Sequence, residues 1–174
     1  MNSPLTGIRA CVFDAYGTLF DFAAAARGCR DALGDHIDAL TSLWRDKQLQ
    51  YTWLRAVQDR HVDFWQVTGD ALDFALETLS IEKPGLRERL MRLYLTLDTF
   101  PEVPEVLARL KKSGLKTAIL SNGSPTMLDA VGNYKSKLCT LLFPAGSANT
   151  SSGSFRYRLP LSSGSGRRPP RRFT

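Results

Sequence analysis

Apolar and polar residues follow two patterns along residues 1–131, one typical of strands and one typical of helices. Two short apolar runs, at residues 8–13 and 115–120, are bounded by polar residues or glycine and predict buried strands. Between them, apolar residues recur at spacings of three and four, which predicts a series of helices. We expect these helices at residues 23–33, 37–57, 71–79, 86–97 and 102–112.

Residues at the ends of these segments refine the boundaries. Asp70 is of a type that caps helix N-termini, so it is expected to begin the helix at 71–79. Gly114 follows two lysines and is expected to end the helix at 102–112. Ser124 and Pro125 predict one more helix after the second strand, with Ser124 as its cap and Pro125 as its first residue.

The order of these elements predicts the fold class. A strand, an inserted group of helices, a helix and a second strand together indicate an α/β protein with a parallel sheet and a helical subdomain inserted after the first strand. In such sheets, chemistry gathers at the carboxyl ends of the strands. Asp14 and Ser121 both follow a predicted strand, so they are expected at the same edge of the sheet.

Composition and charge narrow the class of protein. The chain has 174 residues and no apolar run near the roughly 20 residues that a membrane span needs. No signal peptide is visible, and three widely spaced cysteines favour a reduced, cytoplasmic protein without a disulfide framework or zinc site. Residues 1–132 hold 15 of the 23 Lys and Arg residues and all 17 acidic residues. The basic character therefore belongs to residues 133–174.

Residues from about 132 onward lack any helix or strand period. Ser and Gly become dense from Gly146, and the segment holds eight basic residues and no acid. We expect this tail to be disordered. Its Arg pairs leave open an alternative function, non-specific binding of nucleic acid or an acidic surface. The basic tail is weak evidence for such binding, because a shifted reading frame of GC-rich DNA gives a similar amino-acid sequence. Nucleic acid is therefore not the expected partner.

Asp14 is the main candidate for chemistry. It follows the first apolar run, and Gly17 and Thr18 next to it favour a tight loop. An aspartate in this position can attack carbon or phosphorus and form a covalent intermediate. Taken alone, the same residue can simply cap a turn between a strand and a helix.

Three segments resemble the haloacid dehalogenase superfamily. Residues 13–19 (Phe-Asp-Ala-Tyr-Gly-Thr-Leu) resemble its first motif, and residues 118–125 (Ala-Ile-Leu-Ser-Asn-Gly-Ser-Pro) resemble its second. Residues 43–55 and 63–65 are similar to the cap of its 2-haloacid dehalogenase branch. The resemblance implies a Rossmann-like parallel-sheet core, partial here, at 1–19 and 99–131, and an inserted helical cap at 20–98. Residues 132–174 match nothing in the family and are an aberrant tail.

The resemblance also implies a reaction. Phosphatases of the superfamily carry a second aspartate two residues after the nucleophile, which protonates a poor leaving group. Tyr16 occupies that position here, and a departing halide needs no proton. A superfamily phosphatase is therefore the less favoured alternative. The expected activity is hydrolysis of (S)-2-haloalkanoic acids to (R)-2-hydroxy acids through an ester of Asp14, without metal or cofactor.

Roles for further residues follow from the same resemblance. Arg45 is expected to receive the halide and orient the substrate carboxylate. Thr18 is expected to orient Asp14. The residues expected to bind substrate are Ala15, Tyr16, Ser121 and Asn122. Those expected to wall the pocket are Gln48, Leu49 and Phe64. The family also suggests a homodimer formed through the cap.

Part of the family pattern has no counterpart after the second motif. The family places there a lysine, a tyrosine and a Ser-Ser-Asn…Asp cluster that activate the hydrolytic water, and Lys135 and Lys137 stand in a different context. Turnover is therefore expected to be impaired, and the first strand is expected to become a sheet edge. Our hypothesis is a frameshift near residue 132, which resequencing the gene tests by seeking the missing segment in another frame.

Overall fold

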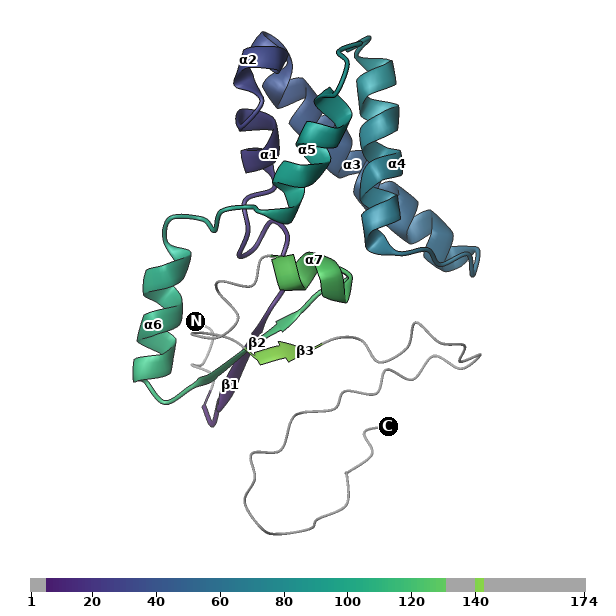
Figure 1. The fold of residues 1–174 in the computed structure, drawn as a ribbon. Coiled ribbons are helices and arrows are strands. Elements are labelled where there is room, and N and C mark those ends of the chain that lie inside the picture. The colour runs from purple at the N-terminus through teal and green to yellow at the C-terminus, as the bar shows by residue number, and fades with distance from the viewer. Residues whose placement is uncertain (1–5, 131–139, 143–174) are drawn as a thin grey trace, which may run out of the picture.

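The computed structural model describes residues 6–130 and 140–142, and every structural statement below concerns this part of the chain. Its sheet contains β1 (Ala10–Phe13), β2 (Lys116–Leu120) and β3 (Thr140–Leu142), in the order β1-β2-β3 (Figure 1). All pairs are parallel, and Phe13 lies opposite Ile119 in the register. The predicted α/β class with a parallel sheet is confirmed.

A layer of helices separates β1 from β2 in the sequence and lies beyond the carboxyl end of the sheet in space (Figure 1). The layer consists of α1 (Ala23–Arg27), α2 (Arg30–Leu33), the short 3₁₀ helix η1 (Gly34–His36), α3 (Ile37–Val57), α4 (Phe64–Thr78) and α5 (Leu86–Leu95). We refer to these helices as the cap. The two ends of α3 are those that the sequence predicts, and α5 ends two residues earlier than expected.

Two predicted helix boundaries in the cap are wrong. The single helix expected at 23–33 is split, because α1 ends at Arg27 and Cys29 leaves the helical conformation. The helix expected to begin at Asp70 begins instead at Phe64. Its cap is Asp63, whose carboxylate accepts a hydrogen bond from the Trp65 N–H at 2.7 Å. A polar residue inside a helix can look like a cap in the sequence, and only the backbone distinguishes the two.

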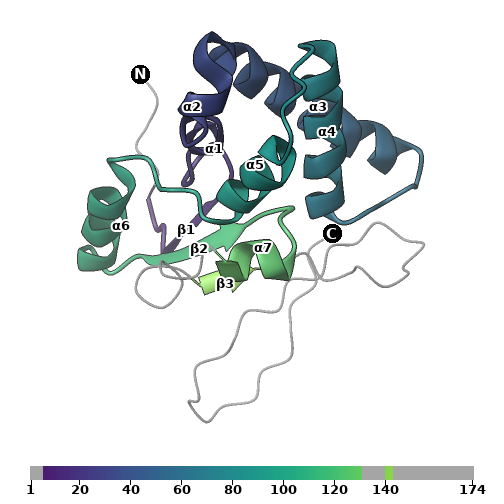
Figure 2. The same ribbon diagram turned by 45° about the horizontal axis from the view of Figure 1, so that its top comes forward.

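Two helices belong to the sheet side of the molecule. α6 (Val103–Lys112) packs beside β2, and α7 (Pro125–Ala130) lies at the carboxyl end of the sheet facing the cap (Figure 2). The predicted start of α7 is confirmed, since the Ser124 Oγ accepts a hydrogen bond from the Met127 N–H at 3.3 Å. The expected stop after α6 is confirmed too, because Gly114 adopts a left-handed φ of +78°.

The two connections between the sheet side and the cap run alongside each other. The Asp21 N–H donates to the Asp98 carbonyl at 2.9 Å, and the Phe100 N–H donates to the Leu19 carbonyl at 3.1 Å. Phe20 and Thr99 form an antiparallel bridge between these bonds. The cap is therefore attached by a paired, two-stranded connection.

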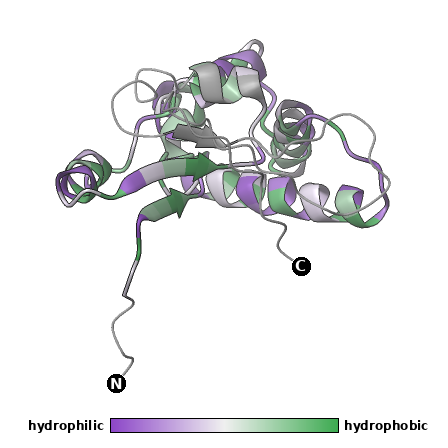
Figure 3. Ribbon diagram, turned by 90° about the horizontal axis from the view of Figure 1, so that it is seen from below, coloured by the Kyte–Doolittle hydropathy of each residue, from purple (hydrophilic) through white to green (hydrophobic). Residues whose placement is uncertain are grey.

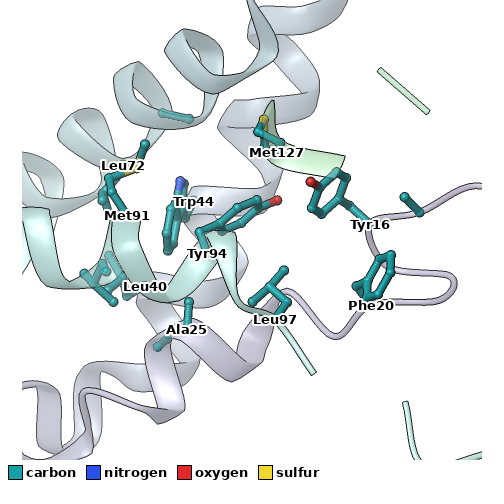
Figure 4. Packing of buried hydrophobic residues seen from close by; sticks show 14 of the residues in the cluster. Tyr16, Phe20, Ala25, Leu40, Trp44, Leu72, Met91, Tyr94, Leu97 and Met127 are labelled. Carbon is teal, nitrogen blue, oxygen red and sulfur yellow. The ribbon is translucent and has the colours of Figure 1, made fainter. Parts of the chain in front are cut away.

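One buried cluster extends from the cap to the sheet side. Tyr94 and Trp44 from the cap, Tyr16 from the loop after β1, and Met127 from α7 are each less than 5% exposed (Figure 4). Burying such large side chains is the dominant favourable term in folding. The cluster therefore links both halves of the molecule through the region around Asp14.

β1 lies at one end of the strand order, as expected for a strand with a missing neighbour. β1 is largely hydrophobic (Figure 3). Even so, Val12 in this strand is 54% exposed. β3 lies within the segment 132–174 that was expected to be disordered, so that expectation is wrong for residues 140–142. The rest of the segment lies outside the described residues. No helix in the described ranges is both long enough and apolar enough to span a membrane.

Candidate active site

Asp14 stands at the point where β1 leaves the sheet. Continuing the β1–β2 register places Asp14 opposite Leu120, one residue before Ser121. The chain then turns tightly, because the Ala15 carbonyl accepts hydrogen bonds from the N–H groups of Leu19 and Phe20, both at 2.9 Å. Neighbouring parallel strands lie about 4.8 Å apart, so the two predicted motifs meet at one edge of the sheet.

Gly17 allows this loop to approach the cap. Its φ of +92° lies in a region that residues with a Cβ rarely adopt. A Cβ at this position would also lie only 3.4 Å from the Arg45 Nη2 and 3.5 Å from the Phe22 ring. Thr18 follows in the same turn, exposed, with its N–H 3.4 Å from the Ala15 carbonyl oxygen.

Arg45 reaches this loop from α3. Its Nη2 donates to the Tyr16 carbonyl at 2.8 Å, and its Nη1 donates to the Gln48 Oε1 at 2.8 Å. The guanidinium carbon lies 5.1 Å from the centre of the Phe22 ring, a distance typical of a cation–π contact. The positive charge of Arg45 is thus held against the loop that follows Asp14, by Tyr16 on one side and Gln48 on the other.

The electrostatic environment of Asp14 is mixed. Partial burial of the carboxyl group raises its pKa above the usual value, although the residue as a whole is exposed. The Ala15 N–H and the positive charge of Arg45 oppose this shift, because both stabilise the carboxylate. A carboxylate that is partly desolvated and only partly compensated is more reactive than one in water.

Ser121 and Asn122 follow β2 at the same edge. Ser121 is 5% exposed, and its Oγ accepts a hydrogen bond from the Gly123 N–H at 3.1 Å. Asn122 is exposed. The structure therefore brings Asp14, Ser121 and Asn122 to one end of the sheet, as the sequence predicts, and Arg45 reaches the same region from α3. The roles of these residues remain predictions.

A cavity of about 10 Å³, close to the size of one water molecule, lies beside Arg45. Its lining residues are Phe22, Thr41, Trp44, Arg45, Gln48 and Tyr94. Of the three residues predicted to wall a pocket, Gln48 lines this cavity. Phe64 is buried with its ring 5.9 Å from that of Tyr16, and Leu49 lies half-buried on α3.

Tyr16 and Tyr94 form an aromatic contact between the loop and the cap. Their rings stack with centres 5.5 Å apart and an interplanar angle of 21°. Burial raises the pKa of both hydroxyls, that of Tyr94 to about 12. Within the described ranges, the Tyr16 hydroxyl is buried without a hydrogen-bond partner.

Tyr94, Phe22, Thr41 and Thr68 are neighbours of the site that the sequence analysis does not single out. Their positions give no periodic or motif signal beyond that of ordinary core residues. Thr68 contacts the site only because α4 packs on α3, where the Trp44 Nε1 donates to the Thr68 carbonyl at 2.8 Å. In the part of the chain that the structure describes, no group of three or more His, Cys, Asp and Glu side chains gathers as a metal site.

Comparisons with known proteins find a matching family model, curated relatives and solved structures. The family model of haloacid dehalogenase-like hydrolases matches residues 8–138. (S)-2-haloacid dehalogenase 4A of Burkholderia cepacia is 48% identical over 124 residues, which are 71% of this chain and 54% of the relative. A solved dehalogenase structure superposes with a TM-score of 0.71 at 45% identity, covering 75% of this chain and 58% of that one.

A second solved structure shows a covalent state. L-2-haloacid dehalogenase from Xanthobacter autotrophicus with chloropropionic acid covalently bound superposes with a TM-score of 0.64 at 42% identity. The match covers 72% of this chain and 51% of that one. The chain thus spans about half the length of the curated relatives that it matches.

Proposed function

The chain belongs to the haloacid dehalogenase-like hydrolase family, and on that premise we propose that its site displaces halide from (S)-2-haloalkanoic acids through an ester of Asp14. The observation that carries the proposal is the Arg45 guanidinium, which α3 brings to the Tyr16 carbonyl two residues from Asp14. This places one fixed positive charge beside one partly desolvated carboxylate, the pair that displacement of an anion from carbon needs.

In the first step, an Asp14 carboxylate oxygen attacks C2 of the substrate from the face opposite the halogen. A C–O bond forms, the C–halogen bond breaks, and the halide leaves with its electron pair. Arg45 and Asn122 receive the halide, while Ser121 and the backbone of Ala15 and Tyr16 orient the substrate carboxylate. Attack from the opposite face inverts the configuration, so an (S) substrate gives an (R) product.

In the second step, water attacks the ester carbonyl carbon of Asp14 and the ester C–O bond to that carbon breaks. One proton of the water passes to the departing alkoxide oxygen and the other to the surroundings. The 2-hydroxy acid leaves and the Asp14 carboxylate is restored. The sequence offers no counterpart of the residues that activate this water in the family. We therefore expect ester formation to be faster than its hydrolysis, so that the ester accumulates.

Tyr16 favours carbon–halogen chemistry over phosphate transfer. Its side chain stands where a phosphatase of the superfamily has its second aspartate. Burial raises the pKa of the Tyr16 hydroxyl, which makes it a poorer proton donor than an ordinary tyrosine. A halide needs no proton to leave, whereas an alkoxide does.

We also propose that the chain forms a homodimer through the end of α3. Trp53, Leu54 and Val57 share this end of the helix and are 62%, 56% and 87% exposed. Val62, just beyond the helix, is 38% exposed. A contiguous group of exposed large apolar side chains is typical of a protein interface.

The test of the proposed reaction detects the ester directly. The full chain is incubated with (S)-2-chloropropionate, and peptide mass spectrometry is used to locate an adduct on Asp14 while free chloride is measured. We expect one chloride released per adduct, with no adduct in Asp14→Asn and little from the (R) enantiomer. Asp46→Asn, an exposed carboxylate next to Arg45, is the matched control and should behave as wild type. A folded wild-type chain that forms no adduct would contradict the proposal.

A further inference from the structure

Resting on the proposed function, we propose that Gln48 is a positioning residue that fixes the orientation of the Arg45 guanidinium. Gln48 is 1% exposed, an unusual position for a glutamine. An amide is costly to bury unless its polar atoms are paired. Here each of them has a partner, and the partners come from three different helices.

The Gln48 amide connects α3 to α4 and α5. Its Nε2 donates to the Thr68 Oγ1 at 2.7 Å and to the Tyr94 hydroxyl at 3.0 Å. Its Oε1 accepts from the Arg45 Nη1 at 2.8 Å. Thr68 and Tyr94 are themselves 0% and 2% exposed, so solvent does not compete for these bonds.

The direction of the hydrogen bonds determines which way the amide faces. The Thr68 hydroxyl donates to the Phe64 carbonyl at 2.7 Å, so its oxygen is left to accept from the Gln48 Nε2. That turns the Oε1 toward Arg45. A guanidinium has only donors, so the Oε1 is the one amide atom that it can meet. Thr68 at one end and Arg45 at the other therefore require the same orientation of the Gln48 amide.

As a result, both terminal nitrogens of Arg45 donate hydrogen bonds. One nitrogen meets the Gln48 Oε1 and the other meets the Tyr16 carbonyl, so the planar group has a defined rotation. Residues three apart on a helix often touch, and that contact alone is weak. The hydrogen bonds to Thr68 and Tyr94 hold the Gln48 side chain in place. The sequence analysis expects Gln48 to wall the substrate pocket, whereas here it acts on the reaction through its contact with Arg45.

The experiment compares Gln48→Met with Gln50→Met. Methionine has a similar shape to glutamine and lacks its polar atoms. Gln50 is exposed on the same helix and accepts a hydrogen bond from Lys47, so the same substitution there is the matched control. In a first arm, the full chain is treated with phenylglyoxal, which modifies arginines, and peptide mass spectrometry follows the rate at Arg45.

We expect Gln48→Met to increase the Arg45 modification rate about ten-fold, because the guanidinium loses one of its two fixed partners. Gln50→Met should leave the rate unchanged. If Gln48→Met does not fold, Thr68→Val and Thr68→Ser replace it. The valine variant should raise the Arg45 rate and the serine variant, which keeps the hydroxyl, should not. Equal rates at Arg45 in all folded variants would overturn the inference.

The second arm measures ester formation from (S)-2-chloropropionate. A charge-assisted hydrogen bond that orients Arg45 toward the leaving halide acts mainly in the transition state. We therefore expect Gln48→Met to lower the maximal rate of Asp14 ester formation about ten- to one-hundred-fold, with a smaller change in the half-saturating concentration. An unchanged maximal rate would overturn the inference. A wild-type chain that forms no ester would contradict the proposed function, while the phenylglyoxal arm still decides the role of Gln48.

Discussion

At the scale of one residue, the proposed reaction makes two demands on Asp14, which has to be ionised to attack and partly desolvated to be reactive. Burial raises the pKa of its carboxyl above 3.8, and the charge of Arg45 limits that rise. Asp14 ester formation should therefore fall as the pH is lowered, with a midpoint above pH 3.8. Replacing Arg45 with Met removes the opposing charge, so the midpoint should move to still higher pH. Ester formation measured across pH 3–8 checks both shifts.

The same raised pKa predicts an effect on stability. An acid whose pKa is higher in the folded state than in the unfolded state stabilises the fold only at pH values below its unfolded pKa. That contribution is lost as the pH rises through the folded pKa. At pH 7 the Asp14→Asn variant avoids the cost of burying charge. We expect its melting temperature to be higher than that of wild type at pH 7, with the difference disappearing near pH 3.

The residues that the sequence identifies at the site are those carried by local signals. Asp14 follows a recognisable strand, and Ser121 follows the next one, so the parallel register alone brings them together. Arg45 was identified through a family resemblance. Tyr94 and Thr68 carry no such signal, because their importance depends on how α5 and α4 pack against α3. Contacts between residues 20 or more positions apart are set by tertiary packing, which periodicity does not encode.

At the scale of an element, the start of α4 shows why helix boundaries are hard to predict. Asp63 and Asp70 both stand before apolar residues, but only Asp63 has the extended backbone of a cap, with ψ at 139°. Asp70 lies inside the helix and pairs with Arg55 at 2.6 Å. β1, β2 and α3 could be predicted well because their apolar patterns are long or sharply bounded. β3 was not predicted, and α1 and α2 could not be separated by pattern.

The two aspartates should differ in their contribution to stability. Replacing Asp63 with Ala leaves the first N–H groups of α4 without a side-chain acceptor, which should cost about 1 kcal/mol in free energy of unfolding. Replacing Asp70 with Ala removes a partly exposed ion pair, which should cost less, at most about 1 kcal/mol. Urea denaturation of both variants measures the difference. A larger loss for Asp70→Ala would contradict the assigned cap.

The exposed apolar end of α3 predicts the oligomeric state. We expect the full chain to be a dimer in sedimentation equilibrium and Val57→Glu to be a monomer, because a charge at an apolar contact has no partner. Val106→Glu is the matched control, since Val106 is 40% exposed on α6, away from this surface. A dimer that persists in Val57→Glu and Trp53→Glu alike would place the interface elsewhere.

At the scale of the whole molecule, the sheet side and the cap are joined by more than their paired connections. Tyr94 from α5 stacks on Tyr16 from the loop after β1, and its ring lies 5.2 Å from that of Trp44. Met127 from α7 belongs to the same buried cluster. Because these buried contacts join the cap to the sheet side, we expect the cap and β2 to unfold together rather than as separate units.

Tyr94→Ala tests this coupling. Removing a fully buried aromatic ring should lower the free energy of unfolding by about 3 kcal/mol or more. In wild type, native-state hydrogen exchange should report equal opening free energies for the α3 and β2 amides. Because the Tyr94 ring joins the cap to the sheet side, Tyr94→Ala should give the α3 amides a lower opening free energy than the β2 amides. Tyr51→Ala is the matched control, since Tyr51 packs edge-on against Phe74 within the cap. Tyr51→Ala should lower the free energy of unfolding by less than Tyr94→Ala does. It should lower the opening free energies of the α3 and β2 amides equally. Equal opening free energies in Tyr94→Ala would mean that the paired connections alone couple the cap to the sheet.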